Sequence, residues 1–201
     1  MTASHFVHGR RAFLAAGLVP LLLPRTARAD GSGDSGAAIS TRTVILVRHA
    51  EKADDKNMPQ NPGLSDLGLA RADALAELLA HAGVTKLFVS EYRRTHMTLA
   101  PLGKALGKRL SPTGAKDIVP LADRIRGLSD GSVAVVAGHS NTVPLLIDAL
   151  GGDVAAIPEL NERGFLAEEA YDRLFLLTLV GVGEDAASRA TNMLELRYGE
   201  G

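Results

Sequence analysis

Three short apolar runs, each followed at once by basic or imidazole side chains, constrain the fold of this chain most strongly. The runs are residues 43–47 (TVILV), 86–90 (KLFVS) and 132–137 (SVAVVA), and the polar segments after them are 48–52 (RHAEK), 91–96 (EYRRTH) and 138–142 (GHSNT). Short runs rich in β-branched residues are typical of buried strands. Ligands of open α/β sheets bind beyond the carboxyl ends of the strands. We therefore expect an α/β fold in which the three polar segments meet at one edge of the sheet.

Such an edge would gather positive charge. It would bring together Arg48, His49, His139 and one or both of Arg93 and Arg94. That concentration is unfavourable unless an anion binds, and a phosphoryl group suits it because guanidinium groups can clamp its oxygens in bidentate fashion. Adjacent residues of a helix face different ways, so only one of Arg93 and Arg94 is expected to face the site.

The motifs resemble those of the histidine phosphatase superfamily, the phosphoglycerate-mutase-like fold. Residues 48–51 (RHAE) resemble its Arg-His-Gly-Glu signature, and residues 138–140 (GHS) resemble its third motif. Ser90, Arg94 and Thr98 have the spacing of the second motif, which selects Arg94 over its neighbour. Residues 64–68 (LSDLG) are similar to the turn into the first helix. The resemblance implies a three-layer sandwich with a mostly parallel central sheet and helices on both faces.

The resemblance also implies a reaction. A neutral imidazole can attack phosphorus to give a covalent phosphohistidine, which water then hydrolyses. His49 would be that nucleophile, and Arg48, Arg94 and His139 would bind the phosphoryl oxygens and stabilise their charge in the transition state. Since the arginines supply the positive field, we expect neither a metal ion nor another cofactor.

The proton donor to the leaving oxygen is less defined. Branches of the family place an acid after the second motif or directly after the second histidine, where this chain has Ser140. Glu51, which we include among the catalytic residues, and Asp123 are the candidates. A poor leaving group needs a donor more than a good one does. We therefore expect the chain to favour activated esters, phosphoanhydrides or phosphohistidine.

Two further residues are assigned to substrate binding. Lys52 would widen the anionic pocket toward a second phosphate, although a solvated lysine is the simpler interpretation. Asn141 follows the third motif directly. The expected partner is a small phosphorylated substrate or a phosphoprotein.

Other functions fit the same residues. One alternative is a phosphate- or phosphoprotein-binding module of the same fold that has lost turnover, and another is a phosphoglycerate-type mutase. A third is a metal-dependent hydrolase that uses His49, Glu51, His96 and His139. The shortness of the chain favours hydrolysis over mutase activity.

The first 40 residues predict export. The paired Arg10 and Arg11 precede an apolar stretch, residues 12–23, that is too short to span a bilayer comfortably, and residues 27–29 (ARA) form a cleavage site. These features look like a twin-arginine signal peptide over residues 1–29. Residues 30–40, rich in Gly and Ser, read as a flexible linker before a histidine phosphatase domain over residues 41–201. We expect a periplasmic or secreted protein with no stable membrane anchor after processing.

Composition limits the partners further. The 201 residues are 46% hydrophobic, which suits one domain with a sizeable core, and they include no cysteine, which excludes disulfides and thiolate catalysis. Loss of residues 1–29, with their four arginines, would lower the formal net charge from −1 to −5. An acidic domain lacks the broad basic surface that nucleic-acid binding requires, so we expect no nucleic-acid partner.

Periodicity predicts the remaining elements. The expected helices cover residues 66–81, a stretch from the second motif to about Gly107, residues 121–128 and residues 142–150, and the expected final strands are 174–180 and 193–198, the second at an edge. In the first helix we expect an apolar stripe of Leu67, Ala70, Ala74, Leu75, Leu78 and Leu79, with Arg71 on the solvated face.

Overall fold

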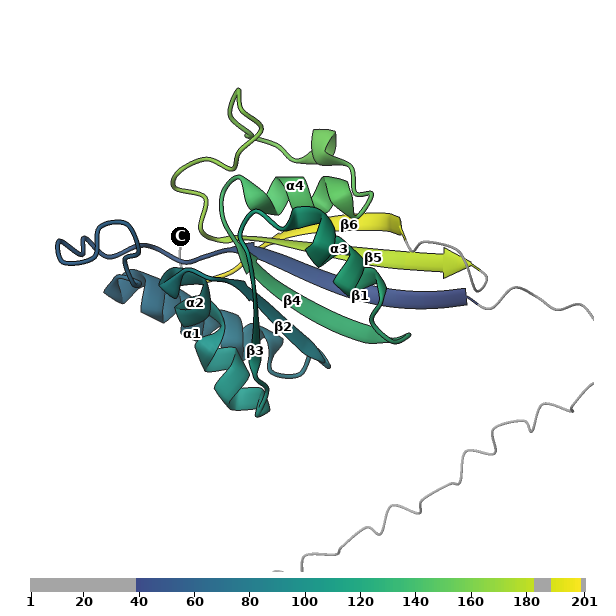
Figure 1. The fold of residues 1–201 in the computed structure, drawn as a ribbon, viewed down its shortest axis with the longest axis horizontal. Helices are drawn as coiled ribbons and strands as arrows, with labels where there is room; N and C mark the ends of the chain where they lie inside the picture. The colour runs from purple at the N-terminus through teal and green to yellow at the C-terminus, as the bar shows by residue number, and fades with distance from the viewer. Residues whose placement is uncertain (1–38, 183–188, 200–201) are drawn as a thin grey trace, which may run out of the picture. The chain divides into compact units, whose positions relative to one another are not determined.

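The computed structural model describes residues 39–182 and 189–199, which form one sheet with helices on both faces (Figure 1). In chain order the elements are β1 (Ile39–Arg48), α1 (Asp66–Leu79), β2 (Lys86–Ser90), α2 (Arg93–Leu106), β3 (Leu110–Thr113), α3 (Ile118–Arg126), β4 (Ser132–Gly138), α4 (Thr142–Ala149), the short 3₁₀ helix η1 (Val154–Ala156), β5 (Arg173–Val182) and β6 (Arg189–Arg197). Within these two ranges, no helix combines the length and apolar character needed to cross a membrane.

The N-terminal boundary differs from the prediction. The expected signal peptide, residues 1–29, lies outside the described residues, as do residues 30–38 of the expected linker. Strand β1 already begins at Ile39, so Ile39 and Ser40 belong to the sheet and not to the linker. The backbone N–H of Thr41 donates to the Asp130 carboxylate at 2.6 Å, which ties this end of β1 to the turn before β4.

The sheet has the strand order β3-β2-β4-β1-β5-β6. The first four of these strands pair in parallel, whereas β5 is antiparallel to β1 and β6 is antiparallel to β5. The predicted mostly parallel sheet is therefore confirmed. The last two strands pair with each other, and β6 lies at an edge as expected.

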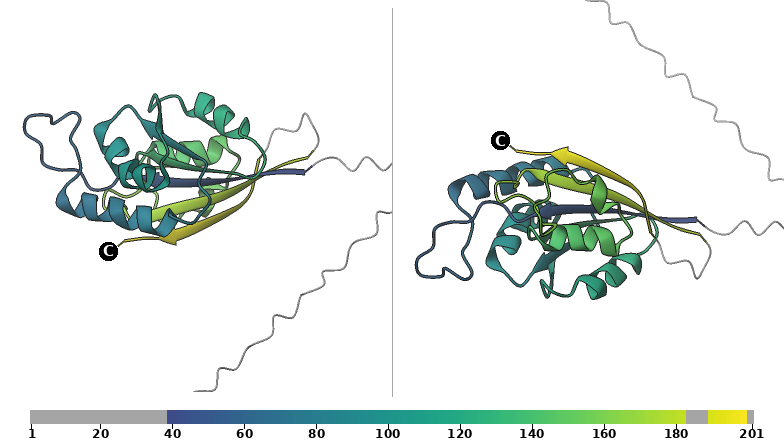
Figure 2. Two further views of the ribbon diagram at one scale, coloured as in Figure 1. Left: turned by 90° about the horizontal axis from the view of Figure 1, so that it is seen from below. Right: turned by 90° about the horizontal axis from the view of Figure 1, so that it is seen from above.

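Different pairs of helices cover the two faces of the sheet, as the two views of Figure 2 show. Along β1, Val44 and Leu46 pack with α3 and α4, whereas Ile45 and Val47 pack with α1 and α2. Successive side chains of a strand point to opposite faces, so a strand covered on both sides reads as a continuous apolar run. This arrangement confirms the expected three-layer α/β sandwich.

The strands that precede the three motifs end side by side. Arg48 of β1 is in register with Gly138 of β4, and Val89 of β2 is in register with Ala137 of β4. The chain therefore leaves the sheet three times at the same edge, and it carries one motif at each exit.

Helix α1 turns a different face to the core than its pattern predicts. Its buried residues are Gly68, Arg71, Ala72, Leu75, Ala76 and Leu79, whereas the expected core residues Leu67 and Leu78 are 56% and 54% exposed. The cause is local. A Cβ on Gly68 would lie 2.4 Å from the carbonyl oxygen of Glu51, so only glycine lets the helix pack this closely on the first motif. Arg71 then points inward, toward the Glu51 carboxylate.

Two other elements depart from expectation. Strand β3 is not predicted from the sequence, since it has four residues and contains Pro112. Proline is tolerated there because β3 is an edge strand. Helix α2 continues through Pro101 and ends as expected before Gly107, which has the left-handed conformation with φ of 62°.

Candidate active site

His49 is the first residue after β1, and the backbone fixes its ring. Its N–H donates to the Gly138 carbonyl at 2.9 Å, so the first and third motifs are joined by a main-chain hydrogen bond. Its Nδ1 lies 2.8 Å from the Ala50 carbonyl oxygen. Because a carbonyl can only accept, Nδ1 carries the proton and Nε2 keeps the lone pair. Burial lowers the pKa of His49 to about 3, which keeps the ring neutral at neutral pH.

His139, the first residue after β4, packs edge-on against His49, with ring centroids 5.3 Å apart. Its Nδ1 lies 3.4 Å from Nη2 of Arg94, and its Nε2 lies 2.9 Å from Oγ of Ser90. A guanidinium group can only donate, so Nδ1 accepts and Nε2–H donates to Ser90. Burial, followed by the charge of Arg94, lowers the pKa of His139 to about 4. Both imidazoles are therefore neutral in the free protein.

Two arginines flank the histidine pair, and each stacks on a tyrosine. The Arg48 guanidinium lies 4.1 Å from the ring centroid of Tyr171, and that of Arg94 lies 4.3 Å from the centroid of Tyr92. Nη1 of Arg48 also donates to the Ala167 carbonyl at 2.8 Å. Burial lowers the pKa of both arginines. Stacking and hydrogen bonding hold the two cations in place beside neutral rings.

One donor on each of these arginines has no acceptor. Nε of Arg48 and Nε of Arg94 are buried, and neither hydrogen-bonds to any part of the described chain. A buried N–H donor without a partner costs about 1–3 kcal/mol, and more when the group is charged. An oxyanion bound beside the two guanidinium groups would offset their positive charges. The pair is therefore suited to a tetrahedral anion such as a phosphoryl group.

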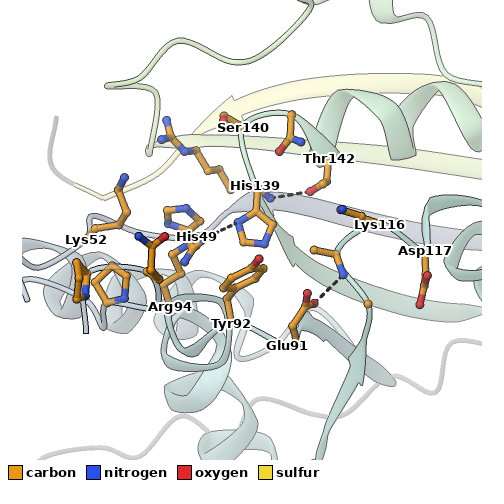
Figure 3. A pocket seen from close by; sticks show the side chains of 17 residues that line it. His49, Lys52, Glu91, Tyr92, Arg94, Lys116, Asp117, His139, Ser140 and Thr142 are labelled. Carbon is orange, nitrogen blue, oxygen red and sulfur yellow. Dashed lines mark hydrogen bonds between the residues drawn. The ribbon is translucent and has the colours of Figure 1, made fainter. Parts of the chain in front are cut away.

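These side chains open into a hollow of about 510 Å³ at the edge of the sheet (Figure 3). The hollow is lined from the strand ends, from the loop after β1 and from the loop after β3, by Arg48, His49, Lys52, Pro59, Gln60, Pro62, Glu91, Tyr92, Arg94, Gly114, Ala115, Lys116, Asp117, His139, Ser140, Asn141 and Thr142. Of the residues that the sequence singled out, Arg48, His49, Lys52, Arg94, His139 and Asn141 thus share one cavity.

Glu51, by contrast, does not line the hollow. Its carboxylate accepts from Nε of Arg71 at 2.8 Å and pairs with Nη2 at 2.7 Å, behind the first motif. The same arginine donates from Nη1 to the Tyr198 carbonyl at 3.0 Å. The expectation that Glu51 acts as an acid in the site is therefore wrong. So is the expectation that Arg71 is solvated, because it connects the first motif to helix α1 and to the C-terminal end of β6.

Other candidates also lie elsewhere. Asp123, the second expected donor, pairs with Arg126 on α3 at 3.0 Å and does not line the hollow. We expected only one of Arg93 and Arg94 to face the site, and motif spacing selected Arg94. Arg93 instead pairs with the carboxylate of Asp55 at 3.5 Å. His96 is half-buried and outside the hollow. Within the described ranges, no three His, Asp or Glu side chains are grouped in a way that could hold a metal ion.

Sequence reasoning missed several residues of the hollow. Glu91 and Tyr92 sit inside the second motif, and Lys116 comes from the loop after the unpredicted strand β3. Tyr171, whose ring stacks on the Arg48 guanidinium group, comes from a segment that the sequence predicts to be a loop. Glu91 and Tyr92 directly follow a predicted strand, and this position could have identified them as residues of the site. No comparable signal exists for Lys116 or Tyr171.

Comparison with known proteins supports these assignments of fold and family. Residues 44–117 match the model of the histidine phosphatase superfamily (branch 1), which confirms the resemblance drawn from the motifs. Over 75 residues, 34% of this chain, the sequence is 35% identical to the 8-oxo-(d)GTP phosphatase of Mycolicibacterium smegmatis. The match spans only 22% of that protein's length.

Solved structures share the fold at low identity. A structure named for phosphohistidine phosphatase SixA from Agrobacterium tumefaciens has 20% identity and a TM-score of 0.54, covering 76% of this chain and 96% of that one. A SixA structure from Nakamurella multipartitia has 20% identity and a TM-score of 0.52, covering 79% and 97%. A third, SixA complexed with tungstate, has 18% identity and a TM-score of 0.52, covering 76% and 96%.

Proposed function

Given that residues 44–117 match the histidine phosphatase superfamily, we propose that this chain is a phosphatase that hydrolyses phosphate esters or related phosphoryl compounds through a phosphohistidine on His49. One observation carries the proposal. The ring centroids of His49 and His139, both neutral, lie 5.3 Å apart. The guanidinium groups of Arg48 and Arg94 lie beside these rings, and each has a buried Nε donor with no acceptor in the described chain. A phosphoryl group bound beside them would be stabilised by both positive charges.

In the first step, Nε2 of His49 attacks phosphorus and the bond from phosphorus to the leaving oxygen breaks. The hydrogen bond from Nδ1 to the Ala50 carbonyl favours this step twice over. It leaves the lone pair on Nε2, and it stabilises the positive charge that the ring gains as the N–P bond forms. The low pKa of His49, caused by burial, means that no proton has to leave the ring first.

Arg48 and Arg94 stabilise the charge that spreads over the phosphoryl oxygens in the transition state. His139, which accepts from Nη2 of Arg94 and donates to Ser90, holds Arg94 in place. The arginines are held by Tyr171 and Tyr92 and need little reorganisation. In the second step, water attacks phosphorus, the N–P bond breaks and inorganic phosphate leaves. His49 returns to its neutral form with the proton still on Nδ1.

The substrate panel follows from the relatives and from the hollow. One relative is named for 8-oxo-(d)GTP and another for phosphohistidine. The substrates to assay are therefore a nucleoside triphosphate and a phosphohistidine peptide, in addition to simple phosphomonoesters. Lys52 lines the hollow next to His49 and has no carboxylate within ion-pair distance in the described chain, so it is free to bind a second phosphate. Asn141 also lines the hollow, next to Ser140 in the chain, and would contact the substrate there.

Variants of His49 test the proposal. Full-length protein should release nitrophenol from a chromogenic phosphomonoester, and it should acquire an acid-labile phosphoryl label when quenched during turnover. His49→Asn should abolish the label and lower kcat by at least about 10³-fold, because it removes the nucleophile. Arg94→Ala should lower kcat by about 10²–10³-fold. His96→Asn is the matched control, since that imidazole lies outside the hollow, and it should keep wild-type activity.

The alternatives predict different results in the same assay. A phosphate-binding module would bind vanadate or tungstate through Arg48 and Arg94 but would release no product from any member of the panel. A mutase would transfer the label from His49 to an added phosphoglycerate faster than to water. Either result would contradict the hydrolase assignment while leaving the anion site in place.

A further inference from the structure

The reaction proposed above leaves one requirement unmet. When the bond from phosphorus to an alkyl oxygen breaks, the departing alkoxide needs a proton. Neither expected donor, Glu51 or Asp123, lines the hollow, because each carboxylate pairs with an arginine elsewhere. The carboxylates that do line it are those of Glu91 and Asp117.

Glu91 is held close to the phosphoryl site by its place in the chain. It directly follows Ser90, the last residue of β2, whose Oγ lies 2.9 Å from Nε2 of His139. The charge of its carboxylate acts on both His139 and Arg94, so it lies within electrostatic range of two residues of the site. In the view of Figure 3, Glu91 lies on the far side of His139 from His49.

That position suits the direction of the reaction. In an in-line displacement the leaving oxygen departs on the side away from the attacking nitrogen. An acid that serves it must therefore stand across the phosphoryl site from Nε2 of His49, and Glu91 lines the hollow beyond His139 as seen from His49 (Figure 3).

The loop after β3 orients the Glu91 carboxylate. The backbone N–H of Ala115 donates to Oε2 at 2.7 Å, and no other hydrogen bond to this carboxylate occurs in the described part of the chain. One oxygen is thus anchored, and the other can carry a proton. Asp117 differs, because its carboxylate folds back over its own loop, where Oδ2 would lie 2.4 Å from a Cβ on Gly114.

We propose that Glu91 is the general acid of this site, an inference that rests on the proposed phosphatase function. As the bond from Nε2 of His49 to phosphorus forms and the ester P–O bond breaks, Oε1 of Glu91 gives its proton to the leaving oxygen. In the second step the resulting carboxylate accepts a proton from the attacking water, whose oxygen bonds to phosphorus as the N–P bond breaks. Glu91 and His49 both return to their starting states.

The test is Glu91→Gln, which keeps an acceptor for the Ala115 N–H but cannot act as an acid. The readout is release of the leaving group in a single turnover with enzyme in excess, so that only the first step is measured. For an alkyl phosphate such as glycerol 2-phosphate, the rate should fall about 10²-fold. For 4-nitrophenyl phosphate, whose leaving group needs no proton, it should change less than about threefold. Asp117→Asn is the matched control, because this carboxylate also lines the hollow but folds back over its own loop, and it should leave both rates unchanged.

The outcomes separate this inference from the function on which it rests. If Glu91→Gln slows both substrates equally, or if Asp117→Asn shows the selective loss instead, Glu91 is not the acid although the chain is a phosphatase. If wild-type protein turns over neither substrate, the proposed function fails and the general acid fails with it.

Discussion

The neutral state of His49 and His139 is set by their surroundings. Both rings are buried, and two guanidinium groups lie beside them, so a further positive charge is disfavoured on either ring. A neutral ring is what a nucleophile toward phosphorus requires. The same condition links the site to folding, because the unfolded chain places no such restriction on the two imidazoles.

Stability should therefore fall on acidification. In the folded protein, burial lowers the pKa of His49 to about 3 and that of His139 to about 4, against 6.5 in an unfolded chain. Below pH 6.5 the unfolded state binds protons that the folded state does not, so the free energy of unfolding decreases as pH falls toward 4. Each histidine contributes a slope of about 1.4 kcal/mol per pH unit. Urea unfolding at pH 7, 6 and 5 measures it, and His49→Gln should remove one histidine's share. Identical slopes in the two proteins would contradict the assigned cause.

For single residues, the sequence predicts the position of a side chain well when that residue directly follows or ends a strand. Arg48, His49 and His139 could be placed because each sits within one residue of such an end, and Arg94 followed from motif spacing. Glu51 could not. Its role depends on Arg71, twenty residues further along the chain and on a helix face that periodicity assigns to solvent.

Among the elements, helix α1 determines how firmly the first motif is held. It packs on the Glu51 backbone at Gly68, and the Ser65 N–H that precedes it donates to the Glu51 carbonyl at 2.9 Å. The Arg71 side chain also donates hydrogen bonds to the Glu51 carboxylate and forms an ion pair with it. Glu51 thus positions the motif from behind and does not take part in the chemistry in front of it.

Gly68→Ala should disturb this contact. The added methyl group would lie 2.4 Å from the Glu51 carbonyl oxygen, so α1 or the first motif must shift. We expect a loss of about 1–3 kcal/mol in the free energy of unfolding and a lower kcat. Gly83→Ala is the control, because its φ of 67° brings backbone strain without any neighbour within 4 Å. It should cost about 1–2 kcal/mol and leave kcat unchanged. Wild-type stability and activity in Gly68→Ala would show that the contact is not needed.

Considering the whole molecule, the layers could be predicted but the strand order could not. Alternating strands and amphipathic helices imply a sheet covered on both faces. The order β3-β2-β4-β1-β5-β6 depends on pairings between distant segments, such as Val44 with Ala134. Likewise, Tyr171 reaches Arg48 from more than a hundred residues away, and nothing near either residue in the sequence indicates this contact.

The expected signal peptide lies outside the described residues and rests on the sequence alone. We propose that the full-length protein is exported through a twin-arginine signal and processed after Ala29. In a bacterium with that pathway, the exported fraction should contain a chain whose N-terminal sequence begins at Asp30. The paired Arg10→Lys and Arg11→Lys variant should keep the precursor in the cytoplasm, because the signal is read through its two guanidinium groups and lysine presents a compact ammonium instead. The control is the double variant Arg25→Lys and Arg28→Lys. It makes the same charge-preserving change outside the Arg10–Arg11 pair, and it should still be exported. Export of the first variant at the wild-type rate would assign the segment to the general secretion route.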